Sequence, residues 1–245
     1  MEEETRREFR STFYVVARPR RAHEYDPLYA LDDPVAFEGS HPTVGAMFRT
    51  IGERGFEIGL HGSYQSWRDP QRLAEERGAL ATATGREVAG IRQHFLRFDL
   101  DRTWDAQERA GFSSDATLGY NEAVGFRAGI AAPFHPWDAA RTRGRDLLEL
   151  PLTLMDGALF RGLGLAPEVA MRRTIAHLES VERAGGMAGL LWHPNVAAEA
   201  LFPGWWACFV TALDHLAARG AWVTSAGEIA AWWRERDRRL NGGQS

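Results

Sequence analysis

The fold of this chain is decided by residues 56–67, which read FEIGLHGSYQSW. The apolar run at the start is typical of a buried β-strand, and it ends on His61. A Gly-Ser turn follows, and Asp69-Pro70 then begins a helix. In folds that alternate strands and helices, ligands and metals bind beyond the carboxyl ends of the strands. His61 is therefore a candidate metal ligand, because neutral imidazole is a common ligand of zinc. A packed core or capping histidine is the alternative.

Composition predicts one globular domain covering residues 1–245. The chain is 44% hydrophobic and contains nine tryptophans, which is enough for one large core. Its net charge of -4 gives no electrostatic reason to expect a nucleic-acid partner. The single cysteine, Cys208, excludes an intramolecular disulfide and a cysteine metal site, and we expect it in the core. We find no signal peptide and no apolar run of about 20 residues, so we expect a cytoplasmic protein without a membrane span.

Strand patterns alternate with helix patterns along the chain. The predicted strands lie at 11–17, 56–60, 88–95, 112–118, 147–155, 189–193 and 221–224. The predicted helices lie at 42–55, 70–84, 103–110, 167–184 and 205–218, and a last helix begins at the capping box formed by Ser225 and Glu228. This alternation indicates an α/β fold with a parallel sheet, open or closed into a barrel.

Polar side chains fall at or just after four of these predicted strands. Each has a structural alternative: Arg92 could be an ion-pair partner, and His94 could be a packed histidine. Asp115 could cap a turn, and His193 could hydrogen bond to the backbone where its strand ends. The carboxyl ends of parallel strands share one edge of a sheet, so we expect these side chains and His61 to form one site.

The order of these motifs resembles the polysaccharide deacetylases of carbohydrate esterase family 4, the NodB-homology family. The similar segments are residues 11–17 (STFYVVA), 55–61 (GFEIGLH), 85–95 (GREVAGIRQHF) and 189–194 (GLLWHP). A closer branch of the family has H-x-S-Y-x-S, R-Q-H-Y-L-R and D-S-T, to which residues 61–66, 92–97 and 115–117 are similar. Residues 125–129 (GFRAG) and Met155-Asp156 also fit that branch, and the likeness spans roughly residues 10 to 230.

The resemblance implies a distorted (β/α) barrel that removes acetyl groups from N-acetylated sugars with a divalent metal, which we expect to be zinc. In such a site a metal-bound hydroxide attacks the acetamide, His193 protonates the departing amine, and Arg92 orients a base carboxylate. The implied site residues are His193, Arg92 and Asp115 for catalysis, Arg127, Tyr64 and Trp192 for substrate binding, and His61 and His94 for the metal.

Two departures from the family pattern matter. The first family motif is a strand that ends in an Asp pair, one a metal ligand and the other the base, and only ten charged or flanking residues precede Ser11. We therefore expect the barrel to lack its first strand, and the exposed edge predicts reduced solubility or a homodimer. Asp32-Asp33 lies in a loop after the wrong strand. Gln65 occupies the position of the second family histidine, so His94, where the family has proline, is the candidate for that imidazole.

Three functions stay open. The first is a metal-dependent hydrolase of the amide bond of an N-acetylated sugar, polysaccharide or similar small-molecule amide. The second is a hydrolase with the same barrel that acts on another C–N bond, such as that of a cyclic ureide. The third is a catalytically silent barrel that binds carbohydrate or a protein partner, which the absent Asp pair favours for the chain as written.

Overall fold

The computed structural model describes residues 1–17 and 23–241. The chain divides into two compact units, and each is built from segments that are distant in the sequence. The sheet unit contains Arg10–Thr117, Phe134–Glu149 and the chain from Ser225 onward. The helical unit contains Met1–Phe9, Leu118–Pro133 and Leu150–Thr224. The two units are described separately below.

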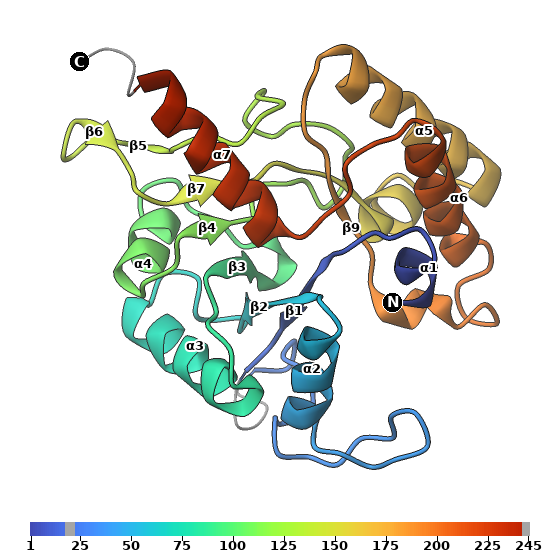
Figure 1. Ribbon diagram of the computed structural model, residues 1–245, viewed down its shortest axis with the longest axis horizontal. Helices are drawn as coiled ribbons and strands as arrows, with labels where there is room; N and C mark the ends of the chain where they lie inside the picture. Colours follow the sequence, from blue (N-terminus) through green and yellow to red (C-terminus); the bar gives the residue numbers. More distant parts are fainter. Residues whose placement is uncertain (18–22, 242–245) are drawn as a thin grey trace. The chain divides into compact units, whose positions relative to one another are not determined.

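A five-stranded parallel sheet forms the centre of the sheet unit, with strand order β1-β2-β3-β4-β7 (Figure 1). The strands are β1 (Thr12–Val15), β2 (Glu57–Gly62), β3 (Gly90–Gln93), β4 (Ser114–Asp115) and β7 (Leu148–Glu149). The sheet buries apolar residues from four of its strands, Val15, Leu60, Ile91 and Leu148, whereas β4 contributes the buried polar residues Ser114 and Asp115. The predicted strands at 11–17, 56–60, 88–95 and 112–118 are therefore confirmed, although three of them are shorter than predicted.

Three helices connect consecutive strands of this sheet: α2 (Val44–Glu53), α3 (Pro70–Thr84) and α4 (Thr103–Arg109). Helix α3 has the predicted bounds because both of its ends are specified locally. The Asp69 side chain accepts a hydrogen bond from the Arg72 N–H at 3.0 Å. At the other end Gly85 adopts the left-handed conformation, with φ of 67°.

The last helix, α7 (Ala226–Asn241), begins at the predicted cap. The Ser225 hydroxyl accepts a hydrogen bond from the Glu228 N–H at 3.3 Å. This helix covers the amino-terminal ends of the strands: the Gly227 N–H donates to Glu57 at 2.7 Å, and the Ala226 N–H donates to the Thr12 hydroxyl at 2.9 Å. The final element of the chain therefore packs against the first strands of the sheet.

The strand predicted at 147–155 is wrong as a single element, because it is two strands in two different sheets. Strand β7 ends at Glu149, and β8 (Leu152–Met155) pairs with β9 (Gly189–Leu191) in the helical unit. Pro151 stands at the break. Proline has no N–H to donate to a strand ladder, so pairing stops there.

The predicted strand at 221–224 is also wrong, because no strand is found at these positions in the described part of the chain. The Ala221 N–H instead donates to the Leu216 carbonyl at 3.0 Å, which extends the end of the preceding helix. The sequence pattern also contained no sign of the short antiparallel pair β5 (Trp137–Asp138) and β6 (Arg143–Gly144) in the sheet unit.

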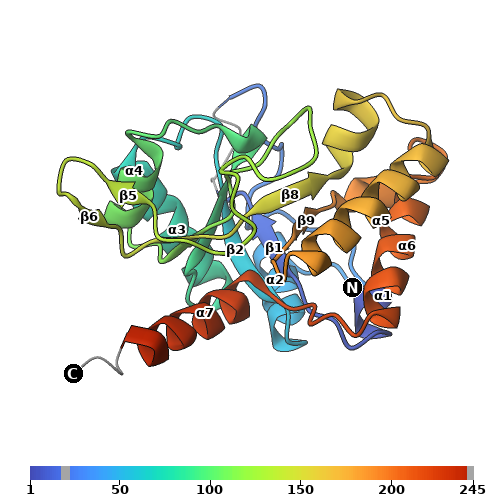
Figure 2. The same ribbon diagram turned by 90° about the horizontal axis from the view of Figure 1, so that it is seen from above.

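Helices α5 (Pro167–Arg183) and α6 (Trp205–Ala218) lie side by side in the helical unit, as Figures 1 and 2 show. They bury Leu178, Ala212 and Cys208 against Leu154 and Phe160, which confirms the core position predicted for the cysteine. A short N-terminal helix, α1 (Glu2–Thr5), also belongs to this unit. No helix within residues 1–17 and 23–241 is both long and apolar enough to cross a membrane.

Candidate active site

The carboxyl-terminal ends of β2 and β3 bring three predicted site residues together. His61 and Arg92 are direct neighbours in the register of these two strands, and His94 follows the end of β3. The rings of His61 and His94 meet edge to face, with centroids 4.8 Å apart. The sheet therefore places the predicted metal-binding histidines next to each other.

Hydrogen bonds to backbone carbonyls orient both rings of this histidine pair. His61 Nδ1 lies 3.0 Å from the carbonyl oxygen of Arg92, and His94 Nε2 lies 2.7 Å from that of Tyr25. A carbonyl oxygen only accepts, so these two nitrogens are placed as donors. The other two nitrogens, His61 Nε2 and His94 Nδ1, face each other at 2.8 Å. The pair therefore brings two ring nitrogens together at this edge of the sheet.

Arg92 is held on the same edge by the backbone and by an aromatic ring. Its Nε donates to the carbonyl of Ala116 at 3.0 Å, and its guanidinium lies 4.3 Å from the centroid of the Tyr14 ring. Burial lowers the pKa of Arg92, and its interactions with Tyr14 and Asp115 oppose that shift. These contacts hold the Arg92 guanidinium against Tyr14 and the backbone of Ala116.

Asp115 lies on β4 and forms a buried pair with Glu149 on β7. The two residues are partners in the parallel register, and neither is exposed to solvent. Asp115 accepts hydrogen bonds from the N–H (3.1 Å) and the hydroxyl of Thr117. The Trp104 indole donates to Glu149 at 2.8 Å. Burial raises the pKa of Asp115 to about 6, although the hydrogen bonds from Thr117 oppose the shift.

Glu149 was not predicted as a site residue from the sequence, although the sequence contains a signal for it. Glu149 is the only charged residue between Leu147 and Met155, and a charge in such an apolar run indicates a buried, partnered group. Asp26, which is buried in the loop that follows β1, was not predicted either. Asp26 Oδ1 accepts from the Tyr64 N–H at 2.7 Å, and no described residue hydrogen bonds to Oδ2.

The alternative carboxylate from the sequence, Asp32-Asp33, has a local role. Asp33 Oδ2 accepts a hydrogen bond from the Ala30 N–H at 2.6 Å and so closes a turn. Asp32 is exposed, as is Gln65, which replaces the second family histidine.

A second pair of polar residues lies in the helical unit, where Asp156 follows β8 and His193 follows β9. Asp156 Oδ1 lies 2.7 Å from His193 Nδ1, and Asp156 Oδ2 accepts the His193 backbone N–H at 2.8 Å. The carboxylate is fully buried and also accepts the Gly157 N–H at 2.6 Å, whereas the His193 side chain is 52% exposed. The carboxylate therefore holds the proton of the neutral ring on Nδ1 and leaves Nε2 for proton transfer.

The expectation that all these residues lie on one sheet is wrong for His193. Strand β9 pairs with β8 in a separate two-stranded sheet, whereas His61, Arg92 and Asp115 lie on the five-stranded sheet. The break at Pro151 causes this difference, since it ends pairing in the first sheet before β8 begins.

Trp192 and Arg127, two predicted substrate-binding residues, also belong to the helical unit. The Trp192 indole donates to the carbonyl of Trp205 at 3.2 Å, and its ring stacks on Phe209 with centroids 5.5 Å apart. Arg127 donates to the carbonyl of Gly119 at 3.3 Å. Trp192 thus packs on α6, and the Arg127 hydrogen bond links two residues of one irregular segment.

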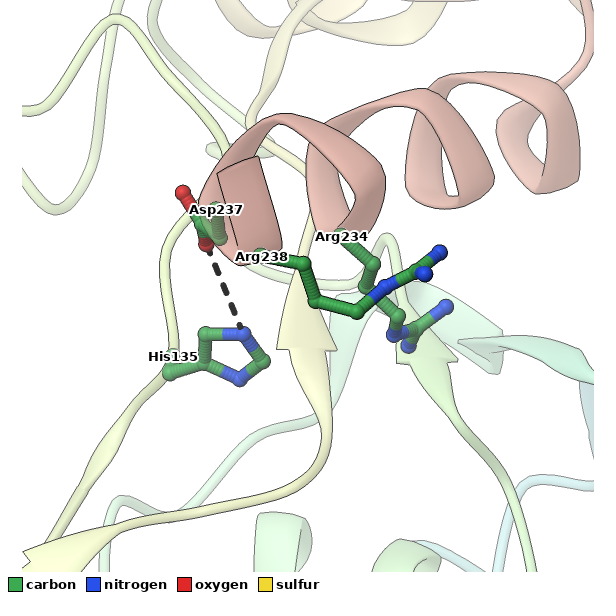
Figure 3. Close-up of a pocket in the computed structure, with 4 residues that line it drawn as sticks. All are labelled: His135, Arg234, Asp237 and Arg238. Atoms are coloured by element: carbon green, nitrogen blue, oxygen red, sulfur yellow. Dashed lines mark ion pairs between the residues drawn. The ribbon is translucent and has the colours of Figure 1, made fainter. Parts of the chain in front are cut away.

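A shallow pocket lies at the other end of the sheet unit, where α7 packs on residues 134–149 (Figure 3). It is lined by His135, Arg234, Asp237 and Arg238, with His135 Nε2 4.0 Å from Asp237 Oδ2. Arg234 donates to the carbonyl of Ser113, which precedes β4. Catalytic chemistry in such folds sits at the carboxyl ends of the strands, so this pocket at the amino-terminal ends is not the candidate site.

Comparison with solved structures identifies the fold. The chain is similar to a crystal structure described as a polysaccharide deacetylase from Mycobacterium smegmatis, with a TM-score of 0.60 and 23% sequence identity over 79% of this chain and 68% of that one. This chain has the polysaccharide deacetylase fold. It is also similar, with a TM-score of 0.50 and 13% identity, to BA3943, a CE4 family pseudoenzyme from Bacillus anthracis. That match covers 94% of this chain and 58% of the other.

A mutant of BA3943 with restored enzymatic activity gives the same TM-score, 0.50, at 12% identity. No family model and no curated protein matches the chain. The predicted fold class, an α/β protein of the deacetylase barrel type, is thereby confirmed.

The deacetylase fold suggests a metal, but the residues present do not fit a catalytic zinc site. Such sites take three protein ligands. His61 and His94 supply two imidazoles, with Nε2 and Nδ1 2.8 Å apart, and so fall one ligand short. No group of three His, Cys, Asp or Glu residues within 1–17 and 23–241 is arranged to hold a metal ion.

Proposed function

We propose that this chain hydrolyses the amide bond of an N-acetylated sugar or polysaccharide. The observation that supports the proposal is the pair formed by Asp156 and His193, in which a buried carboxylate orients a half-exposed imidazole. The deacetylase fold supports the class of substrate, since the similar structure from Mycobacterium smegmatis is described as a polysaccharide deacetylase.

The reaction follows from the position of the His193 proton. Nε2 accepts a proton from a water molecule as the water oxygen attacks the carbonyl carbon of the acetamide. The resulting imidazolium is stabilised by its hydrogen bond to the Asp156 side chain. Nε2 then returns the proton to the nitrogen of the sugar as the C–N bond breaks, and the products are acetate and a free amine.

No step of this reaction uses a metal, because the histidine pair does not supply the ligand set. Zinc bound by His61 and His94 stays a prediction, which elemental analysis of the purified protein would test. Homodimer formation also stays a prediction; β1 has β2 as its only ladder partner among the described residues. Light scattering would decide it.

A second candidate function is a catalytically silent barrel that binds carbohydrate. The incomplete ligand set of the histidine pair favours this candidate. One of the similar structures is itself that of a pseudoenzyme.

Acetate release from oligomers of N-acetylglucosamine tests the two functions against each other. We expect His193→Gln to lower kcat by a factor of about 10² to 10⁴, because it removes the proton-transfer group. His215→Gln is the matched control, since His215 lies on α6 of the same unit and outside the proposed site. Binding without acetate release would identify the silent barrel. Acetate release that persists in His193→Gln would contradict the proposed mechanism. Ring opening of a cyclic ureide, without acetate release from the oligomers, would change the substrate.

A further inference from the structure

We propose that Tyr25 and Phe95, supported by Tyr64, form a stacking platform for a pyranose ring beside the pair of His61 and His94. The proposal rests on the proposed function for its class of ligand, a carbohydrate. It adds a binding surface in the sheet unit, whereas the proton-transfer residues Asp156 and His193 lie in the helical unit.

Three aromatic rings are grouped at this edge of the sheet. The centroid of Tyr64 lies 4.9 Å from that of Tyr25 and 5.8 Å from that of Phe95, and the last two are 5.3 Å apart. Tyr25 is 49% exposed and Phe95 is 53% exposed. Phe95 also lies edge to face with the His94 ring, at 4.7 Å. The exposed rings therefore lie next to the histidine pair, with Phe95 in contact with His94.

Tyr64 is the support of the platform and not its contact surface. The His23 ring stacks on Tyr64 at 4.2 Å, and the Arg97 guanidinium lies 4.2 Å from the same ring. These contacts cover much of Tyr64, which is only partly exposed. The substrate-binding role expected for Tyr64 thus becomes a positioning role, and direct contact passes to Tyr25 and Phe95.

Hydrogen bonds hold the platform in place before any ligand binds. The Tyr64 N–H donates to Asp26 at 2.7 Å, and the Tyr64 carbonyl accepts from Arg97 Nη1 at 2.6 Å. The Tyr25 carbonyl accepts from His94 Nε2 at 2.7 Å. A surface that is already ordered loses little conformational entropy on binding, which favours its use as a binding site.

The backbone at Phe95 adopts an unfavourable conformation. Phe95 and Leu96 have φ values of 57° and 51°, in the left-handed region that residues with a Cβ rarely occupy. Leu96 is buried while the preceding ring is exposed to solvent. Strain of this kind persists only where surrounding structure enforces it, and it concentrates at functional sites.

The chemistry of the platform suits a sugar ring. A pyranose presents a face of C–H groups, which packs on an aromatic ring, and a rim of hydroxyl groups, which needs hydrogen-bonding partners. Tyr25 and Phe95 supply the apolar surface. The Tyr25 hydroxyl, Arg97 and the histidine pair supply polar groups around it.

Binding of the N-acetylglucosamine tetramer, measured by calorimetry, tests the platform. We expect Phe95→Ala and Tyr25→Ala each to raise the Kd about fivefold to tenfold, and the double variant to raise it further. Phe95→Tyr should keep the affinity, because it preserves the ring. The matched control is Trp137→Ala, since Trp137 is a 65% exposed aromatic residue on β5 of the same unit. Its Kd should stay within twofold of the parent.

Three results would overturn the platform: no binding of the tetramer by the parent chain, an unchanged Kd in the double variant, or an equal loss in Trp137→Ala. Thermal melts show whether each variant is folded. If an alanine variant is not folded, Phe95→Tyr still provides a test. The result is separable from the proposed function. Acetate release with an unchanged Kd in the double variant would refute the platform alone, whereas ring-dependent binding without release would refute the hydrolase alone.

Discussion

Asp115 and Glu149 lie opposite each other on neighbouring parallel strands, and neither side chain is exposed to solvent. Burial disfavours the charged form of a carboxyl group, so the folded protein favours the protonated form of Asp115. This places a group that titrates near pH 6 inside the sheet unit.

The first prediction is a loss of stability between about pH 4 and pH 6 that comes from Asp115. Its pKa is raised to about 6 in the folded protein from 3.8, so the folded state binds more protons than the unfolded state in this range. The free energy of unfolding therefore falls as the pH rises through this window. Above the window Asp115 causes no further decrease. Asp115→Asn, which resembles the protonated acid, should abolish this slope and leave the protein at least as stable at pH 8.

Urea unfolding at several pH values measures this slope. Asp146→Asn is the control, because Asp146 has an exposed side chain in the same unit. A slope that is the same in the parent chain and in Asp115→Asn would show that Asp115 is not its source.

The second prediction concerns the left-handed backbone of Phe95. Phe95→Gly should be more stable than Phe95→Ala by about 1 kcal/mol, because glycine adopts a positive φ without the penalty of a Cβ. Urea denaturation of the two variants gives the difference. At the exposed helical position Ala79, the change to glycine should instead cost about 1 kcal/mol. If glycine were less stable than alanine at both positions, the result would argue against strain at Phe95.

The third prediction concerns the turn that follows His61. Glu76 on α3 is buried and accepts hydrogen bonds from the Ser63 N–H at 3.1 Å and the Ser63 hydroxyl at 2.5 Å. Glu76→Ala should lower the free energy of unfolding by about 2 to 3 kcal/mol, because it leaves buried donors without an acceptor. Glu75→Ala, one position earlier on the exposed face, should change it by less than about 0.5 kcal/mol. Equal losses in the two variants would mean that the hydrogen bonds to Ser63 are not responsible.

The fourth prediction concerns the orientation of His193. The side-chain amide introduced by Asp156→Asn can offer an N–H to His193 Nδ1, so this substitution should stabilise the tautomer that has its proton on Nε2. We expect kcat for acetate release to fall by about 10³ to 10⁴ with little change in KM, since binding is not affected. Steady-state kinetics measures both constants. A lower kcat together with a raised KM and a lower melting temperature would instead indicate a damaged fold.

The sequence was sufficient where local chemistry decides the structure. Helix α3 has its predicted ends because Asp69 and Gly85 specify them without help from the rest of the fold. It was insufficient where partners come from distant segments. The apolar run around Pro151 has the composition of a single strand, and only the pairing of its two halves shows that it is two.

The same limit applies to the site. The pairing of His61 with His94 follows from adjacent strands, which the alternation of elements indicated. Tyr25 and Asp26 lie in an irregular loop with no pattern of its own, so their contacts with His94 and Tyr64 could not be predicted. Glu149 was visible as a lone charge, but its partner Asp115 emerged only from the strand order.

Helix α7 has a consequence for the synthesis of the protein. Its Gly227 N–H binds the side chain of Glu57, a residue 170 positions earlier, at the amino-terminal end of the strand that carries His61. A ribosome therefore releases most of the chain before this contact can form. Until then the amino-terminal ends of β1 and β2 lack the cover of α7. Apolar surface and strand edges that are exposed during synthesis favour aggregation.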